Sequence, residues 1–295
     1  MTIRQEMRAA ARRAKALLGD RAALAAGFIA GREDPAGGFR GRGGRGDLYY
    51  SVFALEALAA LDAPAPRAGI ERWLGSFGTG DHLDLVHLAC LARCRADLDE
   101  PGAVGIAGGI LARLEAHRSA DGGYGVVRGC PVGSAYACFL AVGAYQDLRT
   151  PPCEPHRTVA CLRGLRAEDG AYSNSPNMPV GGTAATAAAV TALRHLDCEV
   201  DESAARWLTA RRGSDGGFGA WSGAPVSDLL STAVALHALA GMGAPLDDLR
   251  KPCMDFVNSL WSADGGFRGH ATDEALDCEY TYYGLLALGH LSDPT

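Results

Sequence analysis

Four short stretches repeat one phrase, namely Asp121-Gly-Gly-Tyr124, Asp169-Gly-Ala-Tyr172, Asp215-Gly-Gly-Phe218 and Asp264-Gly-Gly-Phe267. A fifth stretch, Ala36-Gly-Gly-Phe39, lacks only the aspartate. The aromatic residues stand at positions 39, 124, 172, 218 and 267, so the successive gaps are 85, 48, 46 and 49 residues. Because the first gap is nearly twice the others, we expect a degenerate copy inside it, and Ser76-Phe77-Gly78 divides it into 38 and 47. The sequence therefore predicts about six tandem units.

Each unit has the pattern of a helical hairpin. A first helix, such as Ser203–Arg211 or Cys253–Trp261, precedes the phrase, whose glycines permit positive φ and end the helix. A strongly apolar helix follows a short polar loop. The expected second helices are Ser51–Leu61, Asp84–Cys94, Tyr136–Tyr145, Thr186–Leu196, Thr232–Met242 and Thr281–Leu291. They are apolar nearly all round, as helices buried on both sides are, so we place them in an inner ring with the more amphipathic helices outside.

Six hairpins that close on themselves make an all-α (α/α)6 barrel, or toroid, and an open solenoid is the alternative. We favour closure because no end unit shows a polar capping face. The chain is expected to form a single domain over residues 1–295, with an N-terminal helix over about 1–20 and the repeats over about 21–295.

Composition excludes several classes of function. The 295 residues are 48% apolar, and a formal charge of −6 offers nothing to attract nucleic acid or an anionic membrane. No run of 18 apolar residues exists, so no transmembrane helix is expected, and the basic N-terminus lacks the apolar segment of a secretory signal. Nine dispersed cysteines without a Cys-x-x-Cys pair fit a reducing compartment, which predicts a cytoplasmic protein.

Repeats of this length and phrase resemble those of the superfamily of prenyltransferase β-subunits, squalene-hopene cyclases and other class II terpene cyclases. The resemblance extends from Ala36 to the C-terminus. It implies an isoprenoid-handling enzyme with a central apolar cavity for an isoprenoid or another apolar small molecule. Three alternatives stay open: cyclisation or isomerisation started by a carboxylic acid, prenyl transfer from an isoprenoid diphosphate, and a non-catalytic toroid that binds a lipid or a protein.

The protein prenyltransferases bind zinc through an Asp and a Cys that open the fifth inner helix and a His that opens the sixth. Asp228 matches the Asp, but Leu230 stands at the Cys position and Tyr280 at the His position. A single carboxylate does not hold zinc, so we predict no metal and no cofactor; Mg²⁺ would enter only with a diphosphate substrate.

Class II cyclases carry an Asp-x-Asp-Asp-Thr run at an inner-helix N-terminus, where the middle Asp protonates an alkene or epoxide. The matching stretch here is Asp277-Cys278-Glu279-Tyr280-Thr281. The resemblance therefore implies Glu279 as the proton donor, with Asp277 as its ionised partner and Tyr280 in place of the last acid. A carboxylic acid in an apolar cavity beside a second carboxylate stays protonated more readily. The alternative is that Glu279 hydrogen-bonds a neighbouring loop or Arg268.

The inner-helix N-termini should meet at one end of the barrel, which we call the mouth. Candidate substrate-binding residues gather there: Tyr49, Tyr50, Tyr136, Trp221 and Tyr283 as aromatic groups, Arg40 and Arg268 as basic groups, and Asp228. Ring faces stabilise carbocations and arginines bind anions. The alternatives are core packing for the aromatics, solvated surface for the arginines and helix capping for the aspartate. His82, Asp84 and His87 open the second inner helix and are expected to form a polar wall or helix start.

Overall fold

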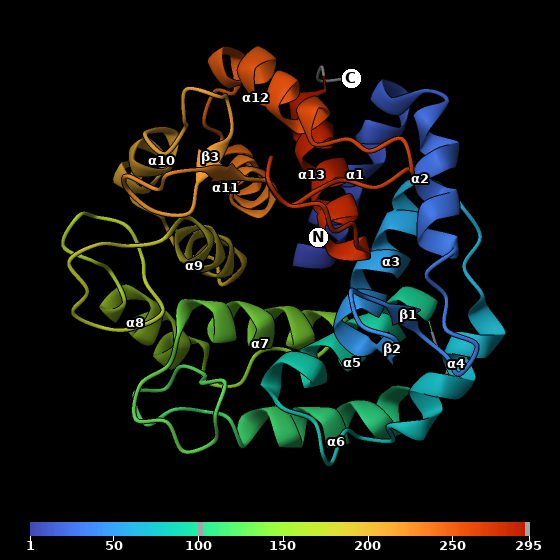
Figure 1. Ribbon diagram of the computed structural model, residues 1–295. Helices are drawn as coiled ribbons and strands as arrows, with labels where there is room; N and C mark the ends of the chain where they lie inside the picture. Colours follow the sequence, from blue (N-terminus) through green and yellow to red (C-terminus); the bar gives the residue numbers. More distant parts are fainter. Residues whose placement is uncertain (100–102, 293–295) are drawn as a thin grey trace.

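The computed structural model describes residues 1–99 and 103–292, and within them six helices form an inner ring surrounded by six outer ones (Figure 1). The inner helices are α3 (Leu48–Ala60), α5 (Leu85–Leu98), α7 (Ala135–Asp147), α9 (Thr183–His195), α11 (Leu229–Gly241) and α13 (Cys278–Leu291). The outer helices are α2 (Arg21–Ala30), α4 (Arg67–Ser76), α6 (Ala103–Glu115), α8 (Pro155–Gly164), α10 (Glu202–Thr209) and α12 (Asp247–Ser259).

The inner ring is closed. Each inner helix packs against the next one along the chain, and α13 packs against α3 to complete the circle. The all-α (α/α)6 toroid predicted from the repeats is therefore confirmed, and the open solenoid is excluded. The degenerate second unit is real: α4 ends at Ser76 within the stretch that divides the long gap, and α5 follows as its inner helix.

The repeat phrase joins each outer helix to its inner partner and to the next unit. Gly122, Gly216 and Gly265 all have positive φ, between 91° and 93°. A side chain at Gly216 would overlap the carbonyl oxygen of Pro252 in α12, and one at Gly265 would overlap that of Leu24 in α2. The sixth turn therefore packs on the first outer helix, so the outer layer closes as well.

The aromatic residue of the phrase is buried, and its backbone is held by the inner helix. The amide of Phe218 donates to Thr232 Oγ1 at 2.9 Å, and that of Tyr172 donates to Thr186 Oγ1 at 3.0 Å. Phe39 makes the same contact with Ser51 at 2.8 Å. This hydrogen bond explains why a hydroxyl residue recurs near the start of the inner helices, since a buried amide without a partner is costly.

The N-terminal helix α1 (Ile3–Leu18) closes one end of the barrel. One of its faces is buried through Ile3, Met7, Ala11 and Ala14 against the inner ring, with its largest contact on α13. Its polar side chains bond residues late in the inner helices, including Asp97, Asp147 and His195. We call this end the floor.

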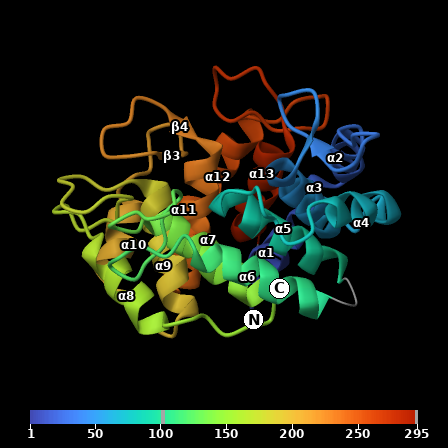
Figure 2. The ribbon, with the colours of Figure 1, turned by 90° about the horizontal axis from the view of Figure 1, so that it is seen from below.

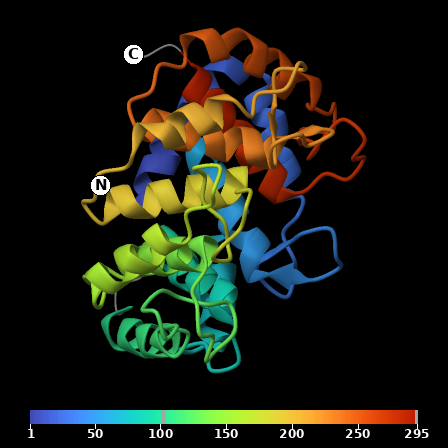
Figure 3. The ribbon, with the colours of Figure 1, turned by 90° about the vertical axis from the view of Figure 1, so that its left-hand side faces the viewer.

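The opposite end is the mouth. Two short hairpins lie there, β1 (Phe39–Arg40) with β2 (Gly46–Asp47) and β3 (Phe218–Gly219) with β4 (Ser227–Asp228), each leading into an inner helix. Figures 2 and 3 show these loops and the loop before α13 on one side of the molecule, with the N-terminus on the other. No helix within residues 1–99 and 103–292 is long and apolar enough to cross a membrane.

Candidate active site

A cavity of about 220 Å³ occupies the centre of the barrel. All six inner helices contribute to its wall, and Met7 of α1 contributes from the floor. The wall is mainly aromatic and aliphatic, with Phe53 and Phe139 among its larger rings. Its polar residues form two sets that are separated by apolar side chains. Tyrosines lie near the mouth, and Arg93, Asp147, Thr191 and His237 lie near the floor.

The acid proposed from the sequence lies just behind this wall. Glu279 is in the first turn of α13, is 9% exposed, and accepts a hydrogen bond of 2.6 Å from the hydroxyl of Tyr49 in α3. Tyr49 lines the cavity, whereas Glu279 does not. Burial raises the pKa of Glu279 to about 7; the bond from Tyr49 lowers it and the charge of Asp277 raises it. Near neutral pH this carboxyl group is therefore present in both protonation states.

Asp277 is the N-cap of α13 and accepts from the amide of Tyr280 at 2.8 Å. Its other oxygen receives the guanidinium of Arg42 at 2.8 Å, and the same arginine binds Asp273 at 2.6 Å. Arg42 comes from the first unit and the two aspartates from the sixth, so this cluster exists only because the ring closes. Arg42 also lies 5.4 Å from the ring centre of Tyr280, where it makes a cation–π contact.

The structure divides the candidate aromatic residues into two groups. Tyr49, Tyr136 and Tyr283 line the cavity. Tyr50 follows Tyr49 but points away from the cavity and packs against Gly41, because adjacent helical residues cannot share a face. Trp221 lies in the loop between β3 and β4, is 53% exposed and forms no part of the cavity wall.

The remaining candidates stand at the ends of loops and helices. Asp228 caps α11: one oxygen accepts from the amide of Ser231 and the other from its hydroxyl, both at 2.7 Å. Burial raises the pKa of Asp228. Arg40 in β1 reaches the carbonyl of Gly31, and Arg268 lies beside Leu276; neither lines the cavity. Arg268 does not contact Glu279, whose hydrogen-bond partner is Tyr49.

The polar start of α5 forms a small network of its own. Asp84 caps the helix and bonds His87 Nδ1 at 2.8 Å, and His87 Nε2 lies 3.5 Å from Asp47. The hydrogen bond to Asp47 is the largest influence that raises the pKa of His87, to about 9. Within residues 1–99 and 103–292, no three His, Cys, Asp or Glu side chains are grouped as metal ligands would be.

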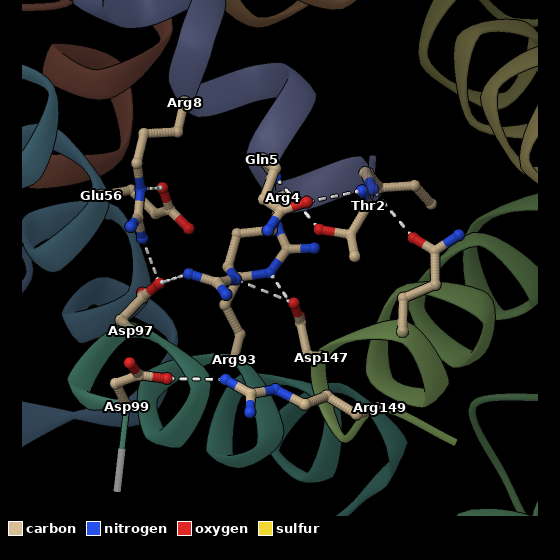
Figure 4. Close-up of polar contacts among 12 residues, drawn as sticks. Thr2, Arg4, Gln5, Arg8, Glu56, Arg93, Asp97, Asp99, Asp147 and Arg149 are labelled. Atoms are coloured by element: carbon tan, nitrogen blue, oxygen red, sulfur yellow. Dashed lines mark hydrogen bonds and ion pairs between the residues drawn. The ribbon is translucent and has the colours of Figure 1, made fainter. Parts of the chain in front are cut away.

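The floor holds charged residues that sequence reasoning missed (Figure 4). Arg4 of α1 bonds both Asp147 at 3.0 Å and Asp97 at 2.8 Å. Arg8 bonds Glu56 at 2.9 Å and also Asp97. Arg93 of α5 bonds Asp147 at 3.0 Å, and both of these residues line the cavity. The available sequence signal was the pair Arg4 and Arg8, one helical turn apart on an amphipathic helix.

Comparisons with known proteins agree with this fold. Residues 184–294 match the family of the prenyltransferase alpha-alpha toroid domain, and the chain matches no curated protein sequence. A type II terpene cyclase from Scytonema, in complex with the product merosterolic acid A, superposes with a TM-score of 0.66 at 14% identity over 95% of this chain and 97% of that one.

Two further structures are similar. Candida albicans protein geranylgeranyltransferase-I complexed with GGPP gives a TM-score of 0.61 at 17% identity over 76% of this chain and 70% of that one. A protein from Actinoplanes gives 0.64 at 17% identity over 92% and 98%. The resemblance to the superfamily of prenyltransferases and type II terpene cyclases is therefore confirmed. At these identities the similar structures establish the fold, and the chemistry has to be argued from this chain's own residues.

Proposed function

We propose that this chain is an isoprenoid-handling enzyme that cyclises or isomerises its substrate in the central cavity, with Glu279 as the initiating acid. The observation that carries the proposal is the position of Glu279: a buried carboxyl group with a pKa of about 7, one hydrogen bond behind the wall of an aromatic cavity. General acids work best when their pKa lies near the working pH.

Tyr49 is the group through which the proton reaches the cavity. When Glu279 is neutral, its O–H donates to the phenol oxygen of Tyr49, across the 2.6 Å contact that joins them. The phenol O–H then donates to an alkene carbon, the π bond supplies the electron pair, and the proton moves from Glu279 to refill the phenol. The substrate becomes a carbocation and Glu279 a carboxylate. A later proton loss from the cation restores the acid and leaves a product with the mass of the substrate.

The cavity wall suits the cation formed in this step. The rings of Tyr136, Tyr283 and Phe53 line the same cavity as Tyr49. Aromatic faces attract cations most strongly where water is excluded. The volume of about 220 Å³ lies below the ~300–1,000 Å³ typical of ligand pockets, which favours a short isoprenoid chain.

The comparisons support the same substrate class. The Scytonema cyclase is also known in complex with the substrate geranylgeranyl dihydroxybenzoate, and the Candida enzyme with GGPP. Prenyl transfer is the weaker alternative here because both oxygens of Asp228 are engaged by Ser231, and Arg42 is already paired with two aspartates.

The test is turnover of geraniol, farnesol, geranylgeraniol and their diphosphates, followed by mass spectrometry for isomers of unchanged mass. Glu279→Gln keeps the size of the side chain but removes its proton, so it should reduce turnover by roughly 10²–10⁴-fold while ligand binding is nearly retained. Tyr50→Phe is the matched control and should leave turnover unchanged. Full activity in Glu279→Gln would refute the proposal. If Asp277→Asn were fully active as well, the next candidate for the catalytic site would be the polar start of α5. Release of diphosphate instead of an isomer would indicate prenyl transfer, and binding without turnover a non-catalytic toroid.

A further inference from the structure

The floor of the cavity contains an arginine, Arg93, with hydrogen-bond donors that have no partner in the described part of the chain. Arg93 donates from Nε to Asp147 at 3.0 Å. Its two terminal nitrogens make no hydrogen bond within the described part of the chain, and they are not among the atoms buried without a partner. Arg93 lines the cavity, and its two terminal nitrogens are the hydrogen-bond donors that it has left for a ligand there.

The other two arginines of the floor make more hydrogen bonds than Arg93 does. Arg4 donates from two nitrogens, to Asp147 and Asp97, and Arg8 donates from two nitrogens, to Glu56 and Asp97. Asp147 is thus shared between Arg4 and Arg93, and the charges of Glu56 and Asp97 also act on Arg93, so Arg93 differs from the other two arginines in its unused N–H groups rather than in an excess of charge. A guanidinium with free N–H groups at the charged end of a mainly apolar cavity can bind a carboxylate through two parallel hydrogen bonds where little water competes.

We propose that Arg93 and the wall around it form a second subsite, which holds the carboxylate end of an amphipathic isoprenoid acid. This inference rests on the proposed function and specifies its substrate class. The acid's apolar chain lies along the aromatic wall, and its alkene end lies near Tyr49 at the mouth. Thr191 lines the cavity from α9, where it is the ninth residue of its helix as Arg93 is of α5, and it supplies a hydroxyl to the carboxylate end.

The arrangement has a directional consequence. Arg93 lies eight residues below the start of α5, which corresponds to about 12 Å along a helix that rises 1.5 Å per residue. A carboxylate held there leaves the far end of a short isoprenoid chain beside the phenol of Tyr49. The floor therefore selects both the end group of the substrate and the carbon that receives the proton.

The experiment measures the affinity of the full-length protein for geranic acid, geraniol and methyl geranate by calorimetry. We expect geranic acid to bind about 10–100-fold more tightly than the other two, as hydrogen bonds to a charged group imply. Arg93→Gln should remove this preference and leave the affinity for geraniol unchanged. Arg93→Lys, which keeps the charge beside Asp147, should retain part of it.

Two control variants distinguish a carboxylate bound at Arg93 from a general effect of lost positive charge. Arg8→Gln disturbs the same buried network but removes no cavity-facing group, so the preference for the acid should persist. Arg42→Gln removes the cation at the mouth and should also leave the preference for the acid unchanged. Loss of the preference in Arg8→Gln or Arg42→Gln, or equal affinity for acid and alcohol in the unaltered protein, would overturn the proposal. The last outcome leaves the proposed function standing. Failure of all three ligands to bind would refute this inference, whereas turnover of farnesol or geranylgeraniol would still support the proposed function.

Discussion

Replacing Gly216 with alanine tests how the repeat phrase joins neighbouring units. Gly216 has a φ of 91°, and a β-carbon there would overlap the carbonyl oxygen of Pro252 in the next outer helix. A side chain in the left-handed region costs about 1–2 kcal/mol. Relieving the overlap requires α12 or the turn to shift, and forced packing of this kind costs about 1–3 kcal/mol more. We therefore expect Gly216→Ala to destabilise the protein by about 2–5 kcal/mol.

Gly223 provides a matched control, because its φ is 80° but a β-carbon there would meet no atom within 4 Å. Gly223→Ala should cost only the backbone component, about 1–2 kcal/mol. Both variants can be measured by urea and thermal unfolding, where about 1 kcal/mol lowers the Tm of a domain of 150–250 residues by roughly 2–4 °C. Equal losses in the two variants would show that contact with Pro252 contributes nothing, and an unchanged Tm for Gly216→Ala would refute the turn geometry altogether.

Three further measurements follow from the site and the floor. Because Glu279 has to carry a proton and its pKa is raised to about 7, kcat/KM should be constant at low pH and fall about tenfold per unit above pH 7; a flat profile to pH 9 would contradict the acid assignment. Glu6 has its pKa lowered to about 2, chiefly by its hydrogen bond to His195, so its contribution to stability is complete above pH 4.5 and is lost as the pH falls towards 2. Glu6→Gln should therefore cost about 1–2 kcal/mol at pH 7 in urea unfolding and much less at pH 2, after allowance for screening. Elemental analysis of the purified protein should give less than about 0.1 zinc per chain, and a value near one that disappears in Asp228→Asn would establish a metal site.

Local patterns were enough to predict the repeats. Asp215-Gly-Gly-Phe218 and its counterparts mark a turn that depends on glycine conformation and, in the last three units, on a threonine hydroxyl 14 residues after the aromatic, so both appear in the sequence itself. The apolar inner helices were recognisable for a similar reason, since burial on all sides leaves them without a polar face. These local features were sufficient to predict the fold.

The site depends instead on contacts between distant parts of the chain. Tyr49 and Glu279 are 230 residues apart, and Arg42 and Asp277 are 235 apart, so only ring closure in three dimensions reveals either pair. The role of α1 was missed for the same reason, because Arg4 meets Asp97 and Asp147 across 93 and 143 residues. The exposed position of Trp221 also had no signature, since an aromatic residue in a loop beside the mouth has the same local pattern whichever way its ring turns.

The hydrogen bond between Tyr49 and Glu279 makes a prediction that does not require a substrate. The phenol stabilises the ionised carboxylate, so this contact holds the pKa of Glu279 lower than burial alone would set it. Tyr49→Phe removes the donor but keeps the ring in the wall. A hydrogen bond to a charged group contributes about 1.5–3 kcal/mol, and one pKa unit corresponds to about 1.4 kcal/mol, so the pKa of Glu279 should rise by about 1–2 units.

The pKa can be followed by infrared titration of the protonated carboxyl C=O band, assigned by its absence in Glu279→Gln. Tyr50→Phe is the comparison, because Tyr50 is the neighbouring residue yet its ring packs on Gly41 and makes no hydrogen bond to the acid. We expect the titration to move upward in Tyr49→Phe and to stay in place in Tyr50→Phe. Identical midpoints in the unaltered protein and both tyrosine variants would mean that the phenol does not bond the carboxyl group, and the proton path from Glu279 into the cavity would then lose its first step.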